Sequence, residues 1–258
     1  ILFIDGLTYF VSAFCLFHVR RGYVSPREHL KYPREFSPAT EATAEALESG
    51  ENPAVAEAGL SLAIYADLKE GFAYLKSQPV VRSLGLTHAV MMASVVSSNI
   101  VLVALANDVL HSGATGLGFL ESGWALGAVA GGLIASQLPQ KIRLAGYVAA
   151  MALLVFVHIT IPFVAFLAGA VALQAVAGLC RATGGVVAQS ALLTIVPRHF
   201  MGRTQSAIAI LTTSLQVTMS VALGWIAQSV GIATGFFLLA LLYLAATFSA
   251  ARARQLLR

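Results

Sequence analysis

Residues 116–136 read GLGFLESGWALGAVAGGLIAS. The run is long enough to cross a bilayer, because about 20 apolar residues span roughly 30 Å of hydrocarbon. Gly123, Gly127 and Gly131 recur at every fourth position, so they share one helix face, and such faces let two helices approach closely in lipid. The run also contains Glu121, and a carboxylate at membrane depth indicates a functional site. We expect a closely packed membrane-spanning helix that carries a functional acid.

The composition of the whole chain predicts an all-α polytopic membrane protein. Of its 258 residues, 58% are hydrophobic and 11% are charged, and the mean hydropathy is +0.80. Soluble domains contain about 25% charged residues. Cys15 and Cys180 lie in apolar runs, where we expect them to be small core residues. Since no hydrolase, kinase or metal motif is present in the sequence, we expect no enzymatic activity, no cofactor and no metal site.

Further apolar segments divide the chain into predicted spans and connections. We expect seven spans, at 1–19, 84–106, 116–136, 143–161, 164–195, 204–228 and 231–250. The run 164–195 is longer than a single span needs, so we expect it to tilt or to extend beyond the bilayer. The six spans within 84–250 are expected to form one transporter half, with 251–258 as a cytoplasmic tail.

Residues 20–83 are expected to form a linker between the first span and the others. Its first part, to residue 58, is polar, and 59–78 regains a helical period with an apolar stripe. That stripe contains Leu60, Ile64, Leu68, Phe72 and Leu75. Two interpretations remain open at this stage: the helix lies on the membrane surface, or it packs against the transporter body.

The basic residues predict the orientation of the chain in the membrane. Of the sixteen Lys and Arg residues, eight lie in 20–82, two in the loop at 141–143, two at 198–203 and three in the tail, while the alternate loops contain none. This alternation follows the positive-inside rule, which places the linker and the C-terminus in the cytoplasm. We therefore expect a multi-pass protein of the cell (inner) membrane that binds no nucleic acid, despite its net charge of +4.

Four motifs resemble drug-exporter-type transporters of the major facilitator superfamily. IDGLTYFVSAFCL at 4–16 resembles their sixth span, and NDVLHSGATGLGFLESGWALGAVAGG at 107–132 resembles the join of spans seven and eight. DLKEGFAYLKSQPVVR at 67–82 is similar to the helix before the seventh span, and VPRHFMGR at 196–203 to the loop between spans ten and eleven. The last motif matches through Pro197, Gly202 and Arg203.

The resemblance is to the group that includes macrolide efflux pumps and the enterobactin exporter, and it covers spans six to twelve of a twelve-span protein. It implies a C-terminal six-helix bundle preceded by the sixth span, with an N-terminal transporter half as the missing partner. It also implies a proton-coupled antiporter that exports amphipathic or drug-like small molecules by alternating access.

Two acidic residues are candidates for proton coupling. A carboxylate in a low-dielectric site favours its protonated form, so Glu121 can load and release a proton as its surroundings change. The alternative is that Glu121 lies near the outer interface and stays solvated. Asp5 has a similar position in the first span, where helix packing is the alternative.

Arg181 is the one basic residue inside a predicted span after the linker. Gln174, Gly178, Arg181, Gly185 and Gln189 lie at helical spacing, and such a polar face should point into the protein. Arg181 either binds an anionic group or a carboxylate there, or it snorkels to the cytoplasmic headgroups. Polar stripes on two other spans add further candidates to line a substrate cavity, Asn99 and Gln216.

Three functions remain open at this stage. The first is the proton-coupled exporter just described, and the second is a siderophore or lysophospholipid transporter, because Arg181 in a cavity favours anionic cargo. The third is a non-transporting membrane scaffold that docks a partner through residues 20–82. Transport is favoured, since a scaffold has no need for polar stripes inside its spans.

Overall fold

The computed structural model of the chain describes residues 53–256. The predicted first span at 1–19, with Asp5, lies outside the described residues, as does the polar linker up to residue 52. Within the described part every regular element is a helix, and six helices are long and apolar enough to cross a membrane. The prediction of an all-α polytopic membrane protein is therefore confirmed.

The chain begins its described part with α3, Pro53–Ser77, which precedes the six candidate spans. The spans are α4 (Pro79–Ala104) with the π-helical turn η2 (Leu105–Val109), α5 (Gly113–Gln137), α6 (Arg143–Thr160) between the short helices η3 (Gln140–Ile142) and η4 (Ile161–Phe163), α7 (Leu167–Ile195), α8 (Arg198–Ser229) and α9 (Ile232–Leu256). Four of the six predicted segments fall wholly inside these helices.

The other two predicted segments, 164–195 and 231–250, begin slightly before their helices. After Pro162 the chain leaves η4 in an extended conformation, with Phe166 at φ −125° and ψ 136°, so α7 starts only at Leu167. Before α9, Gly231 adopts a φ of +122°, a conformation that glycine reaches without steric cost. Hydropathy alone does not report either break, because the residues on both sides are apolar.

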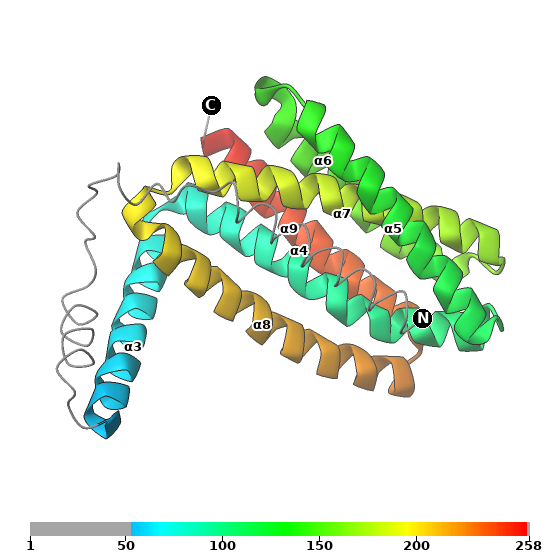
Figure 1. Cartoon of the computed structure of the whole chain (residues 1–258). Helices are drawn as coiled ribbons and strands as arrows, with labels where there is room; N and C mark the ends of the chain where they lie inside the picture. The colour runs from blue at the N-terminus through cyan, green and yellow to red at the C-terminus, as the bar shows by residue number, and fades with distance from the viewer. Residues whose placement is uncertain (1–52, 257–258) are drawn as a thin grey trace, which may run out of the picture.

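Each span contacts at least one other: α7 packs against α5, α6 and α4, and α9 packs against α6, α4 and α8. Helix α8 also packs against α4. The connections between the spans alternate between the two ends of the bundle. The loop between α5 and α6, the loop between α7 and α8, and the end of α9 lie at one end (Figure 1). Lys141, Arg198 and Arg252 belong to this end, so the basic residues of these two connections and of the end of α9 are gathered there.

Helices α5 and α7 make the closest contact in the bundle, through glycines. A methyl group on Gly127 would overlap the backbone carbonyl oxygen of Ala175, and one on Gly123 would lie 2.8 Å from that of Val171. Gly131 faces α7 in the same way. The hydroxyl of Thr183 on α7 donates to the Gly131 carbonyl at 3.0 Å. The small-residue face of α5 thus allows backbone-to-backbone packing.

The outer faces of the bundle are apolar. Leu126 on α5, Val221 on α8 and Phe248 on α9 are each about 70% exposed, at 72%, 70% and 69%. Large apolar surfaces of this kind are unusual on soluble monomers, and they suit contact with lipid tails.

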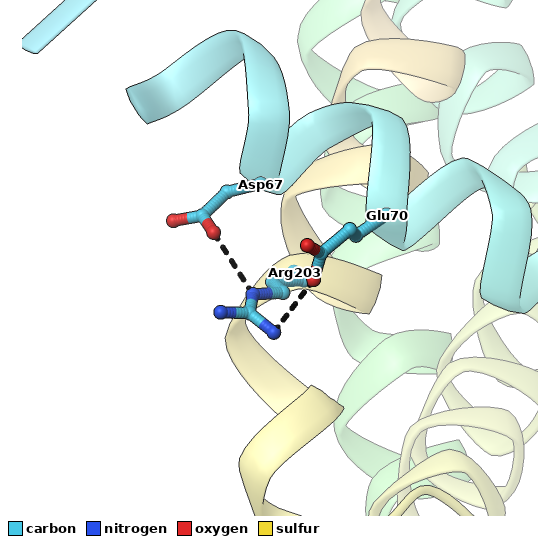
Figure 2. Close-up of polar contacts among 3 residues, drawn as sticks. All are labelled: Asp67, Glu70 and Arg203. Carbon is cyan, nitrogen blue, oxygen red and sulfur yellow. Dashed lines mark hydrogen bonds and ion pairs between the residues drawn. The ribbon is translucent and has the colours of Figure 1, made fainter. Parts of the chain in front are cut away.

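Helix α3 contacts the N-terminal end of α8 by polar and apolar interactions. Figure 2 shows that Arg203 lies between two acids of α3, with Nε donating to Asp67 Oδ1 at 2.9 Å and Nη1 to Glu70 Oε2 at 2.8 Å. Tyr74 stacks on Phe200, with ring centroids 4.8 Å apart. These contacts favour the interpretation in which this helix packs against the bundle of spans and does not lie on the membrane.

Candidate functional site

A polar cavity of about 80 Å³ lies between α4, α5 and α7. It is lined by Val95, Ser98, Asn99, Leu102, Glu121, Trp124, Gln174 and Arg181. Four of the candidates predicted from sequence, Asn99, Glu121, Gln174 and Arg181, therefore come together here, although they belong to three different helices. The cavity has room for several water molecules or for one small polar group.

Arg181 on α7 is 5% exposed and is hydrogen-bonded inside the bundle. Its Nε donates to the hydroxyl of Tyr243 on α9 at 3.0 Å, and its Nη2 donates to Ser98 Oγ on α4 at 3.3 Å. Nη2 also lies 3.4 Å from Nε2 of His158 on α6. The side chain thus joins four helices, and the alternative in which Arg181 snorkels to the headgroups is wrong.

The hydrogen bonds of His158 assign its tautomer. Its Nδ1 lies 2.8 Å from the Leu154 carbonyl oxygen, which can only accept, so Nδ1 carries the proton. Nε2 is then left as an acceptor toward Arg181, which can only donate. This arrangement is that of a neutral imidazole. Ser98, His158 and Tyr243 are therefore all neutral partners of the guanidinium.

Arg181 has no acidic partner in the described part of the chain. The ion pairs present there, at a limit of 4.0 Å, are those of Arg203 with Asp67 and Glu70. Glu121 is half-buried and lines the same cavity, but it is not in salt-bridge contact with Arg181. A buried cation without a counter-ion is costly, so the cavity is a site where a negative charge is favoured.

The indole of Trp124 adds an unsatisfied hydrogen-bond donor to the cavity wall. Its Nε1 is buried and has no hydrogen-bond partner among residues 65–256. An indole N–H can only donate, and it needs an acceptor that the described residues do not supply.

The cavity is open on one side. Gln174 is 8% exposed, whereas Asn99 is exposed, so the cavity opens on the side of Asn99.

Two other candidates lie away from this cavity. Gln189 is half-buried on α7 and Gln216 is half-buried on α8, and neither lines it. The backbone carbonyl of Gln216 accepts from Ser97 Oγ at 3.1 Å, and Ser97 also bonds to Ser220 Oγ at 3.0 Å. The polar stripe on α8 therefore joins α8 to α4.

The motif at 196–203 includes the beginning of α8, and none of its residues lines the cavity. Pro197 precedes the first turn of α8, and Gly202 has open space around it. Arg203 holds α3 through the ion pairs of Figure 2. No group of three or more His, Cys, Asp or Glu side chains able to hold a metal occurs within the described range.

Sequence reasoning missed His158 and Tyr243. Both lie in apolar runs. The one feature of the sequence that could have drawn attention to them is that a polar side chain at membrane depth needs a hydrogen-bond partner. Neither sequence spacing nor hydropathy identifies that partner, because it is on another helix.

Comparison of the chain with protein-family models, curated proteins and solved structures gives no match.

Proposed function

We propose that this protein is a secondary active transporter that moves an amphipathic small molecule across the membrane by alternating access, coupled to protons. The observation that carries the proposal is the polar cavity around Arg181 and Glu121, inside a bundle whose outer faces are apolar. Charged groups in a membrane are expensive, and they mark substrate or ion pathways. A scaffold has no need for polar residues that line a cavity inside its spans.

The position of the cavity supports the proposal. It is built from α4, α5 and α7, and exposed Asn99 leaves one side open. A second six-helix half facing this side would complete the site, and rocking of the two halves would open it to each side in turn. The four motifs that resemble drug exporters of the major facilitator superfamily support this arrangement and favour export as the direction.

Glu121 is the residue proposed to couple transport to protons. It is half-buried, it lines the cavity, and no basic side chain pairs with it in the described part of the chain. Opening and closing of the cavity would change its exposure to water, and thereby the balance between its charged and neutral forms.

The full-length protein in liposomes tests the proposal. Two permanently charged amphiphiles serve as probes, 3-phenylpropane-1-sulfonate and 3-phenylpropyltrimethylammonium, because a pH gradient does not redistribute them by itself. With the membrane potential clamped at zero, a pH gradient should drive accumulation of at least one probe. Glu121→Gln should lose this accumulation, whereas Asp108→Asn, at an exposed acid outside the cavity, should keep it.

Failure of the folded protein to accumulate either probe under either sign of the gradient would overturn the proposal. Unchanged accumulation by Glu121→Gln would remove Glu121 from the coupling mechanism.

A further inference from the structure

We infer that the cavity binds an oxyanion group of the cargo, such as a carboxylate, phosphate or sulfonate, with Arg181 as its charge anchor and the Trp124 indole N–H as a second donor. This inference rests on the proposed transport function and names the substrate class. It selects an anionic amphiphile over the cationic compounds that many exporters of drug-like molecules carry.

The positive charge of Arg181 is not compensated within the described residues. Its three hydrogen-bond partners are the neutral side chains of Ser98, His158 and Tyr243, and Arg181 is 5% exposed. Its Nε and Nη2 are used in these bonds, whereas Nη1 makes no hydrogen bond within the described residues. A guanidinium with free N–H groups is well suited to an oxyanion.

The rest of the cavity wall offers further hydrogen-bond donors. Trp124 presents a buried N–H without an acceptor, and the amides of Asn99 and Gln174 can donate as well. A bound oxyanion would satisfy Arg181 and Trp124 together. An ammonium group would satisfy neither, because it supplies no acceptor and would be repelled by Arg181.

The volume of the cavity limits the size of the group that it can bind. A cavity of about 80 Å³ is far below the 300–1,000 Å³ or so that pockets for drug-sized ligands occupy. It fits a head group and not a whole amphiphile. The structure thus assigns the cavity as a head-group subsite, with the apolar remainder of the cargo left to the open side.

Glu121 shares the cavity wall and sets the sign of proton coupling. Ionised Glu121 would repel a bound anion, whereas protonated Glu121 would not. By thermodynamic reciprocity, a proton on Glu121 and an anion at Arg181 each strengthen the binding of the other. The other titratable groups near Arg181 in the described part of the chain are His158 of α6, Tyr243 of α9 and Cys180 of α7, and none of them lines the cavity.

The linkage between proton and anion binding also determines whether the two move in the same direction across the membrane. A proton and an anion that favour one another's binding move the same way across the membrane. For an anionic cargo, Glu121 would therefore support co-transport, in contrast to the proton exchange that the resemblance to drug exporters implies.

Equilibrium binding to the full-length protein in lipid nanodiscs tests the inference. A background in which every tryptophan except Trp124 is replaced by phenylalanine makes Trp124 the one tryptophan reporter. The other tryptophan of this sequence, Trp225, is 68% exposed on α8 and does not line the cavity. In this background, 3-phenylpropane-1-sulfonate should change the Trp124 emission saturably. The matched 3-phenylpropyltrimethylammonium should bind at least tenfold more weakly.

Variants give effects of opposite sign. Arg181→Gln should weaken sulfonate binding at least tenfold, whereas Glu121→Gln should strengthen it severalfold at neutral pH. Sulfonate binding to the wild-type cavity should tighten as the pH falls, and Glu121→Gln should abolish this dependence, because the probe itself does not titrate. Asp108→Asn, at an exposed acid outside the cavity, should change none of these values.

Tighter binding of the ammonium probe than of the sulfonate would overturn the inference, as would unchanged sulfonate affinity in folded Arg181→Gln. If Arg181→Gln does not fold, weaker sulfonate binding by Glu121→Gln has the same force. The outcomes separate the two proposals: sulfonate binding without transport refutes the transport function, and transport with a preference for the cation refutes only the oxyanion site.

Discussion

The close contact between α5 and α7 makes a sharp prediction for Gly127→Ala. The added Cβ would overlap the backbone carbonyl oxygen of Ala175, and backbone cannot rotate away as a side chain can. Overpacking of this kind costs about 1–3 kcal/mol, and we expect the upper end because the obstacle is main chain. The control is Gly132→Ala on the same helix, where an added methyl group meets nothing within 4 Å.

Comparison with Gly132→Ala also removes the effect of alanine on helix propensity. Alanine favours a helix over glycine by roughly 0.5–1 kcal/mol, but this gain applies to both variants and cancels in their difference. A difference of about 3 kcal/mol corresponds to a Tm difference of about 6–12 °C for a domain of this size. Thermal unfolding of the two purified variants in detergent measures it. Equal Tm values would refute the packing argument for the α5–α7 contact.

Three other predictions concern stability and topology. Arg203→Ala removes both ion pairs that hold α3 to α8. Because the groups are partly exposed, the loss should be about 1 kcal/mol, which lowers Tm by about 2–4 °C. Arg198→Ala should not lower Tm, and equal effects of the two variants would mean that the ion pairs add no stability. Tyr243→Phe leaves the Arg181 Nε without its acceptor and should cost about 1–3 kcal/mol in thermal unfolding, so an unchanged Tm would show that this bond is dispensable. Lys141→Cys and Val230→Cys lie in the connections at opposite ends of the bundle, and Val230 is exposed next to Gly231. The two cysteines should react with a membrane-impermeant thiol reagent from opposite sides, Lys141→Cys from the cytoplasm; labelling of both from one side would contradict the orientation.

The spans were accessible to sequence reasoning because the bilayer imposes a length and a composition on every crossing segment. The glycine repeat of α5 was equally readable, since positions four apart share a face whatever the helix packs against. Arg181 and Gln174 were placed on one face for the same reason, and both are buried.

The partners of these residues were beyond the sequence. Whether Arg181 points into the bundle or toward the headgroups depends on the rotation of α7, which is set by packing against α5 and α6. His158 and Tyr243 come from two further helices, and nothing in their local sequence links them to Arg181. The apolar stripe of 59–78 likewise predicts a covered face, but it does not distinguish lipid from α8 as the cover.

Proton movement tests whether the cavity around Arg181 and Glu121 couples an anionic cargo to protons that move in the same direction. Liposomes containing the full-length protein and an internal pH dye would receive an inward gradient of 3-phenylpropane-1-sulfonate, with the membrane potential clamped. The interior should acidify, and Arg181→Gln should abolish this change. An unchanged internal pH with folded protein that binds the probe would contradict coupling, and a rise in internal pH would contradict co-transport.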